Sequence, residues 1–320
     1  MHVPKLTVVI VVGARRDRVP GALASVLRQA NVDEIEVRLI DIAPGDPPPV
    51  SQSDHRSVHV HRMPAGTLFS VAKATGVRHA AAPVIVFLEE HCRVWPGWAS
   101  ALIGAHRGPW AGVGAEVHNA NPEVLLSRHI EVLNYSECLP PAARREVAVL
   151  PGHNSSFKRD VLLGYGDRLV ELLRAEIVLH TQLRRDGHRL LLEPAARFSH
   201  INETSLESAA RGRFIWNRCY GWMRARTFGW SMPRRVVYIV STPLIPVYSL
   251  SRLALFAVRK RPALLPRLIV ASPMLFAMQL AAACGHSAGL LFGIGDAEAR
   301  FTLYEMNEFR RYREPVRIGE

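Results

Sequence analysis

Apolar and polar residues alternate along the first part of the chain in segments with the spacing of strands and helices. The pattern predicts strands over 7–12, 35–40 and 84–88 and helices over 19–29 and 68–80. The first strand reads TVVIVV, a β-branched run typical of a strand buried on both faces. Strands that alternate with helices indicate an α/β fold, with a Rossmann-like, mostly parallel sheet and helices on both faces.

Polar residues stand where two of these predicted strands end. Asp41 closes the second strand, and the run Glu89, Glu90 and His91 closes the third. Open parallel sheets bind ligands beyond the carboxyl ends of their strands. In an extended strand Glu89 and His91 would share one side, with Glu90 on the other. A carboxylate beside an imidazole can bind a divalent metal, although these three residues alone equally describe a charged strand end in solvent.

The composition changes after His200. A stretch over 211–235 is rich in arginine and carries three tryptophans, and two apolar runs follow over 236–258 and 268–284. A helix needs about 20 apolar residues to cross a bilayer. The runs predict a membrane-associated helical hairpin that either crosses the bilayer or lies in its interface. Two buried helices of a soluble domain are the alternative, because prolines and Arg252 interrupt the apolar pattern.

These changes in composition predict four parts. They are an α/β domain over 1–205, a basic Arg/Trp-rich junction over 206–235, the hairpin over 236–295, and a charged C-terminal helix and tail over 296–320. The last helix is expected from Ala297 to about Arg313.

The net charge of the chain limits the classes of partner that we expect it to bind. The formal net charge is +12, which suits nucleic acid, anionic lipid or phosphorylated substrates. The arginines and tryptophans adjoin apolar runs and no recognisable nucleic-acid module, so we expect an anionic membrane surface as a partner and no nucleic acid. The four cysteines form no CxxC pair, which favours a reducing cytoplasm. The motifs GxGxxG, GxxxxGK[ST], HExxH and GxSxG are absent from the sequence, which argues against a dinucleotide oxidoreductase and other common enzyme classes.

Several motifs in order give the chain a family resemblance between Thr7 and His200. They read LIDIAPGD, SVAKATGVRHAAA, VIVFLEEHCRVWPGW, PGHNSSFKRDVL and RAEIVLHTQLRRDGHRLLLEPAARFSH. Their order and spacing resemble the family-2 glycosyltransferases. The resemblance implies a GT-A fold, a nucleotide-diphospho-sugar as donor, a divalent metal (Mn²⁺ or Mg²⁺), and inverting transfer of the sugar to an acceptor hydroxyl.

The same resemblance assigns residues to the donor and the metal. Glu89 and His91 take the ligand positions of the family's DxD motif, and His200 resembles a histidine near the diphosphate or metal. Asp41 matches an acid that recognises the nucleotide, with a turn aspartate as the alternative. Lys73 stands where the family often has a basic residue near the nucleotide or diphosphate, and a solvated helix lysine is equally consistent with the sequence.

The remaining carried-over residues concern the catalytic base and the acceptor and donor sides of the pocket. Glu176 occupies the acidic position of the family's ED-x-x-L-x-x-R-L-x-x-x-G helix, which implies a catalytic base that removes the proton of the acceptor hydroxyl. A surface glutamate paired with an arginine is the alternative. Gly152 and Asn154 correspond to a G-x-N segment that lines the family's pocket. No QxxRW motif follows His200, so the transfer of single sugars is favoured.

A second function stays open at this point. The metal motif and the acidic pair depart from the family's usual pattern, so a catalytically degenerate nucleotide-sugar-binding membrane protein, acting as a scaffold, competes with an enzyme. For an enzyme, the apolar runs suggest work at the cytoplasmic face of the cell membrane, integral or monotopic, on an acceptor such as a lipid-linked or envelope glycan. The sugar, the nucleotide and the oligomeric state do not follow from the sequence.

Overall fold

The computed structural model describes residues 3–45, 55–152 and 154–308. The chain forms two compact units. The first lies within Met1–His118 and Glu137–Ile201, and the second within Asn119–Ser136 and Asn202–Arg317. The segment 119–136 therefore packs with the C-terminal part of the chain, although the sequence analysis placed it inside the 1–205 domain. That boundary stays a prediction, and each unit is considered by itself.

One mixed sheet forms the centre of the first unit. Within the described residues it has nine strands in the order β3-β2-β1-β4-β8-β6-β9-β5, with β7 paired to β9. The strands are β1 (Leu6–Val12), β2 (Ile35–Asp41), β3 (Val58–Arg62), β4 (Val84–Phe87), β5 (Cys92–Val94), β6 (Trp110–Asn119), β7 (Arg145–Val147), β8 (Ser156–Lys158) and β9 (Arg189–His200).

The parallel half of this sheet carries the predicted strands. β1 pairs in parallel with both β2 and β4, and β2 pairs in parallel with β3. Every residue of β1 is buried, as its β-branched run predicted. The parallel register aligns Val12 with Asp41, so the polar residues that end these strands emerge at one edge of the sheet. The α/β fold with a Rossmann-like sheet is confirmed.

The other half of the sheet is antiparallel and brings a distant segment to that edge. β8 pairs antiparallel with β4 and with β6. The short strand β5 pairs antiparallel with the end of β9, in a register that sets Cys92 opposite His200. The last residue of β9 is therefore a neighbour of the segment that follows β4.

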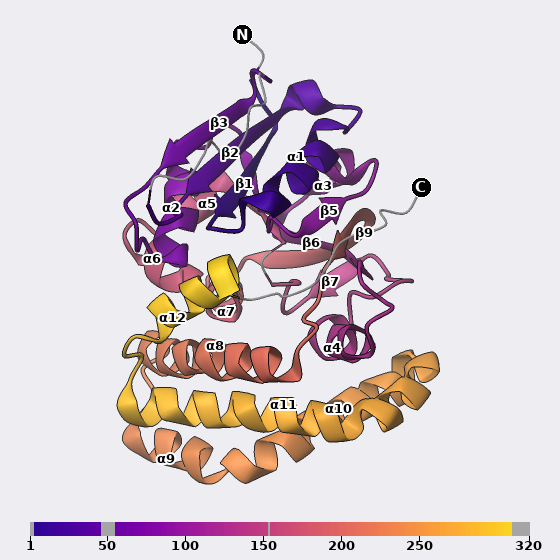
Figure 1. Cartoon of the computed structure of the whole chain (residues 1–320), viewed down its shortest axis with the longest axis vertical. Coiled ribbons are helices and arrows are strands. Elements are labelled where there is room, and N and C mark those ends of the chain that lie inside the picture. The colour runs from indigo at the N-terminus through magenta and orange to yellow at the C-terminus, as the bar shows by residue number, and fades with distance from the viewer. Residues whose placement is uncertain (1–2, 46–54, 153, 309–320) are drawn as a thin grey trace. The chain divides into compact units, whose positions relative to one another are not determined.

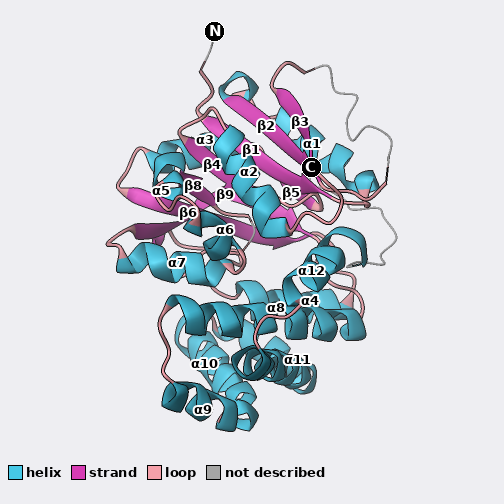
Figure 2. Ribbon diagram, turned by 90° about the vertical axis from the view of Figure 1, so that its left-hand side faces the viewer, coloured by secondary structure: helices cyan, strands magenta, loops and turns pink. Residues whose placement is uncertain are grey.

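Helices cover both faces of the sheet (Figure 1). One face carries α1 and α3, and the other carries α2, α5 and α6 (Figure 2). The helices of this unit are α1 (Val19–Leu27), α2 (Phe69–His79), α3 (Trp98–His106), α5 (Arg159–Leu163), α6 (Arg168–Leu173) and α7 (Glu176–Arg185). Helix α2 lies close to β1, because a Cβ at Gly76 would stand 2.3 Å from Cγ1 of Val9. This close approach sets Lys73, earlier on α2, against the sheet.

The second unit is helical. Its helices are α4 (Leu125–Tyr135), α8 (Leu206–Thr227), α9 (Met232–Val240), α10 (Ile245–Lys260), α11 (Leu265–Phe292) and α12 (Ala297–Leu303). The predicted basic junction is thus mostly one long helix, α8. A turn of π-helix, Tyr304–Glu308, follows α12, and the predicted continuation over 309–313 lies outside the described residues.

Small residues let α8 and α11 approach each other closely in the second unit. A Cβ at Gly285 would stand 2.2 Å from the backbone oxygen of Phe214, and one at Gly289 would stand 2.2 Å from that of Arg218. The two helices lie side by side in both views (Figures 1 and 2). Glycines four residues apart that permit backbone contact are a feature of helix packing in membranes, although soluble helices also use them.

The two predicted apolar runs have different structures. The first is divided between α9 and α10, which are bent by 52° at their junction. The second belongs to a longer helical stretch, Pro262–Phe292, which has a mean hydropathy of 1.8 over its most apolar window and 33% of that window buried. By length and composition this stretch could cross a bilayer, and the bent pair could form a second, broken span. The predicted association with a membrane stays a prediction.

Candidate functional site

The residues that follow β4 form a turn. β4 ends at Phe87, and residues 88–91 separate it from β5, with the amide of Cys92 donating to the carbonyl of Glu89 (3.0 Å). The expectation that Glu89 to His91 continue an extended strand was therefore wrong. The chain must turn here because β4 belongs to the parallel half of the sheet, whereas β5 pairs with β9.

The turn gathers the three predicted metal ligands. Oε2 of Glu89 lies 3.2 Å from Nε2 of His91 and 3.3 Å from Nε2 of His200. The two Nε2 atoms are themselves 3.2 Å apart. All three side chains are buried. A buried cluster of one carboxylate and two imidazoles can hold a divalent metal ion.

Sequence reasoning missed a fourth member of this cluster. The donor atoms of Glu89, His91, Cys92 and His200 all lie within 4.8 Å of one another. Cys92 has no CxxC partner in the sequence, so its spacing gave no metal signal. The signal lies in the sheet register, which sets it opposite His200.

Asn154 supports Glu89 through two hydrogen bonds. Its Nδ2 donates to Oε2 of Glu89 (3.2 Å), and its Oδ1 accepts from the amide of Glu89 (3.0 Å). The predicted pocket residue therefore orients the carboxylate of a predicted metal ligand. Apart from Gly152 and its chain neighbours, no described atom lies within 4 Å of the point where a Cβ on Gly152 would stand. Its predicted role in the pocket stays a prediction.

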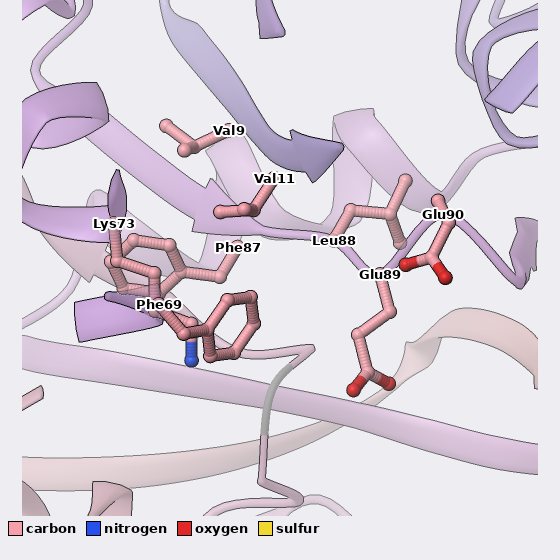
Figure 3. Close-up of a pocket in the computed structure, with 8 residues that line it drawn as sticks. All are labelled: Val9, Val11, Phe69, Lys73, Phe87, Leu88, Glu89 and Glu90. Atoms are coloured by element: carbon pink, nitrogen blue, oxygen red, sulfur yellow. The ribbon is translucent and has the colours of Figure 1, made fainter. Parts of the chain in front are cut away.

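Glu90 leaves the turn in a different direction from Glu89 (Figure 3). Its Oε1 accepts from Nη1 of Arg18 (3.2 Å), and both side chains are buried. Arg18 stands in the polar run after the first strand, where its position gave no sign of burial. The same Oε1 lies 3.5 Å from Nδ1 of His91, so the second carboxylate of the turn contacts a member of the metal-ligand cluster from the ring side opposite Nε2. The expectation that Glu90 is the weaker ligand stays a prediction.

A pocket adjoins this turn on the side of α2. Its lining residues are Val9, Val11, Phe69, Lys73, Phe87, Leu88, Glu89 and Glu90 (Figure 3). The ammonium of Lys73 lies 4.3 Å from the ring centroid of Phe69 and 5.4 Å from that of Phe87, which are cation–π distances. Lys73 and Glu89 therefore stand in the wall of one pocket.

Glu176 reaches this pocket through Lys73. Its Oε1 accepts from the Lys73 ammonium in an ion pair whose two side chains are both buried. Both alternatives from the sequence, a solvated lysine and a surface glutamate, are therefore wrong. Glu176 is the first residue of α7, and the pair joins the start of that helix to α2.

His180 lies one helical turn after Glu176 and was also missed. It is fully buried, its ring stacks on Phe157 at 5.9 Å, and neither ring nitrogen has a hydrogen-bond partner among the described residues. Burial lowers the pKa of His180 to about 4, and the charge of Lys73 acts in the same direction, whereas that of Glu176 opposes it. The ring is therefore neutral at physiological pH.

Asp41 lies at the end of β2 between two arginines. Its Oδ2 accepts from Nη2 of Arg16 (2.6 Å) and Nη1 of Arg62 (2.8 Å). Burial alone would raise the pKa of this carboxyl, but the two guanidinium hydrogen bonds hold it below its usual range. Asp41 is not among the residues that line the pocket of Figure 3. Its predicted contact with a nucleotide stays a prediction.

The sequence that forms this site matches a known protein family. The sequence profile of Glycosyl transferase family 2 matches residues 7–165, which include the strands of the parallel half and the turn with Glu89 and His91. No curated protein matches the sequence significantly.

Solved structures give the fold. A mannosyltransferase from Pyrobaculum calidifontis, in complex with GDP-Man and Mn²⁺, is similar with a TM-score of 0.54 and 15% identity over 88% of this chain and 87% of that chain. GalNAc-T7 with UDP, GalNAc and Mn²⁺ has a TM-score of 0.48 and 13% identity over 72% of this chain. The match covers 52% of that second chain. The family match and the fold together make this chain a family-2 glycosyltransferase of the GT-A type.

Proposed function

We propose that this glycosyltransferase moves a sugar from a nucleotide-diphospho-sugar to an acceptor hydroxyl, with inversion at the anomeric carbon. The observation that carries the proposal is the meeting of Glu89, His91 and His200 beside the pocket that Lys73 lines. The mannosyltransferase of the same fold is solved with GDP-Man and Mn²⁺, which supports a donor and a metal of these classes here.

The cluster offers a place for the divalent metal. Glu89, His91 and His200 would hold the ion, and Asn154 keeps the Glu89 carboxylate oriented toward it through two hydrogen bonds. A bound cation stabilises the negative charge that the leaving diphosphate gathers in the transition state. Lys73 adds a positive charge to the wall of the same pocket.

We assign the base to Glu176. Its carboxylate is held in position by Lys73, and a carboxylate within hydrogen-bond reach of an acceptor hydroxyl can remove its proton as the new bond forms. Attack from the face opposite the leaving diphosphate gives inversion. Asp41, ionised between Arg16 and Arg62, would accept hydrogen bonds from the base or ribose of the nucleotide.

The second unit supports attachment at the cytoplasmic face of the cell membrane, where nucleotide sugars are available. Apolar side chains of α9, α10 and α11 are exposed, among them Val237, Val240, Val258 and Ile269. Arginines stand beside these residues in all three helices, and such cations suit an anionic surface. A lipid-linked or envelope glycan acceptor would be reached most easily there.

A transfer assay tests the reaction. Detergent-purified protein is incubated with a panel of nucleotide-diphospho-sugars and lipid-linked or soluble glycan acceptors. Mass spectrometry follows the glycosylated product, and NMR gives its anomeric configuration. The proposal expects product of inverted configuration from the wild type and almost none from Glu176→Gln. If one donor binds the wild type but is never transferred, the chain is the degenerate nucleotide-sugar-binding protein instead.

Membrane attachment needs its own test. Flotation with liposomes that contain anionic lipid should recover the wild type, and the double variant Val237→Glu/Val240→Glu should float less. Val60→Glu, which changes an exposed valine of β3 in the first unit, serves as the matched control. Equal flotation of all three proteins would contradict attachment through α9.

A further inference from the structure

We propose that Cys92 completes the metal site, so that Glu89, His91, Cys92 and His200 together select a borderline transition metal of the zinc class over Mg²⁺. The inference rests on the metal site of the proposed function and narrows the class of ion that occupies it. The motif Glu89-Glu90-His91 does not by itself indicate this selectivity, because it does not contain the Cys92 thiol.

The oxygen and nitrogen donors have the spacing of one small tetrahedral ion, and all four donor atoms lie within 4.8 Å of one another. A tetrahedral site with metal–nitrogen and metal–oxygen bonds of about 2.0–2.1 Å separates those donors by about 3.3 Å. The three separations among Glu89, His91 and His200 are 3.2, 3.2 and 3.3 Å. A thiolate bound at about 2.3 Å should lie about 3.6 Å from the carboxylate oxygen, and Sγ of Cys92 lies 3.9 Å from Oε2 of Glu89.

The backbone holds the thiol at this point. Cys92 is the first residue of β5 and pairs with His200 in the antiparallel register of β9. Side chains directly opposite each other in such a ladder project from the same face, with Cβ atoms about 4.5–5.5 Å apart. Cys92 is fully buried, so its side chain has little freedom to turn toward solvent. The position of the sulfur therefore follows from the pairing of the two strands.

The donor types decide which ion is preferred. Mg²⁺ favours oxygen ligands in octahedral geometry and keeps several waters. This cluster offers a single carboxylate, and its other donors are two imidazoles and a thiol, which favour Zn²⁺ and its neighbours in the first transition row. Glu89 and the thiolate of Cys92 would balance the charge of a divalent ion. Zinc can expand from four to five ligands, which leaves a position for a diphosphate oxygen.

Cobalt substitution tests the thiol directly, because a cobalt–thiolate bond absorbs in the near ultraviolet, apart from the visible bands of the ion. The full-length protein is stripped with a chelator and titrated with Co²⁺ in the absence of any donor sugar. We expect the thiolate band in the wild type and its loss in Cys92→Ser and Cys92→Ala, with the visible bands retained. Cys138→Ser, which changes another buried cysteine of the same unit, should keep the band.

Competition measures the selectivity. Zn²⁺ should displace Co²⁺ near one equivalent, whereas Mg²⁺ in large excess should not. The Kd for Zn²⁺ should rise in Cys92→Ser by at least about tenfold. Mutating residues that only support the metal ligands already weakens metal binding by about 10–100-fold, and the loss of a ligand should cost no less. Near-ultraviolet circular dichroism checks that each variant is folded.

The outcomes separate this inference from the proposed function. Cobalt that binds the folded wild type without a thiolate band, or that Mg²⁺ displaces at a similar concentration to Zn²⁺, would overturn the role of Cys92. Binding that still depends on Glu89 would then leave the metal site of the proposed function in place. If the folded wild type binds none of these ions, both proposals fail together.

Discussion

The ammonium of Lys73 and the carboxylate of Glu176 form an ion pair in which both side chains are buried. The two residues come from α2 and from the first position of α7. Lys73 also lines the pocket beside Glu89. The pair therefore links the proposed base to the wall of the proposed donor pocket. Its contribution to protein stability can be measured separately from its contribution to the transfer rate.

Replacing Glu176 by glutamine should abolish most transfer. The loss of a general base lowers a rate by about 10²–10⁴-fold, so we expect kcat to fall by that order while the Kd of the donor changes little. Single-turnover kinetics with a saturating donor, together with calorimetric binding, separates the two quantities. A kcat that stays within a few-fold of the wild type would remove Glu176 from the mechanism.

The same substitution should also destabilise the protein, because it removes the negative charge that pairs with the buried Lys73 ammonium. Breaking one side of a buried pair costs about 3–5 kcal/mol, whereas replacing both sides is often nearly neutral. In urea unfolding, Lys73→Met/Glu176→Gln should therefore recover much of the stability that Glu176→Gln loses. Transfer should not recover. A double variant that is as unstable as the sum of the single variants would argue against the buried pair.

Stability should fall in mild acid because of two buried histidines. Burial lowers the pKa of both His106 and His180 to about 4, against about 6.5 in an unfolded chain. A base whose folded pKa is depressed contributes its full stability above pH 6.5 and loses it as the pH falls from 6.5 through 4. The full loss of stability is about 3 kcal/mol for each ring.

Urea unfolding at several pH values measures this dependence. His180→Phe keeps a ring against Phe157 and should flatten the curve between pH 6.5 and 4. His59→Gln, at an exposed position of β3, leaves both buried rings in place and should follow the wild type. An unchanged slope in His180→Phe would show that His180 is not buried in its neutral form.

Gly289 should tolerate no side chain if α8 and α11 pack as described. A methyl group there would stand 2.2 Å from a backbone oxygen of α8, so the helices must separate, at about 1–3 kcal/mol or more. Gly104→Ala in α3 is the matched control, since no described atom outside its chain neighbours and the nearby backbone of α3 lies within 4 Å of its Cβ position, and it should be neutral or stabilising. Thermal unfolding in detergent compares the two variants. Equal melting temperatures would contradict the close approach of the helices.

Asp41→Asn should weaken donor binding without removing the metal. Hydrogen bonds to a charged group contribute about 1.5–3 kcal/mol, so the Kd of the nucleotide sugar should rise by about ten- to a hundredfold. Asp33→Asn, at an exposed ion pair with Arg56, should leave the Kd unchanged. Binding of cobalt should be the same in both variants. An unaltered donor Kd in Asp41→Asn would assign the carboxylate a structural role between its arginines.

The sequence predicted β1, β2 and β4 of the parallel half, but not β3, because the signals of those three strands are local. The β-branched run of β1 and the helical spacing of α1 and α2 each depend on neighbouring residues, and the predicted bounds lie within two residues of those observed. Glu89, His91 and His200 could also be named in advance, through motifs in a known order. Their meeting in one cluster required the pairing of β5 with β9, which no single segment encodes.

The residues that the sequence analysis missed obtain their roles from tertiary contacts. Cys92, Arg18 and His180 carry no motif, and each acquires its role from a partner distant in the chain or from complete burial. The turn at 88–91 was missed because an apolar run that ends in charged residues looks extended in the sequence. The bend between α9 and α10 lies close to Pro243 and Pro246, whose disruption of helices was visible, but a sequence does not give its angle.

The most direct test of the central claim is calorimetric binding of nucleotide-diphospho-sugars to the purified protein, with Mn²⁺, Zn²⁺, Mg²⁺ or chelator, alongside Glu89→Ala. The account predicts that one donor binds the wild type only when metal is present, and that Glu89→Ala, although folded, does not bind it. A donor that binds equally well in chelator and to Glu89→Ala, or the binding of no donor to folded protein, would contradict a metal-dependent nucleotide-sugar site at the end of β4.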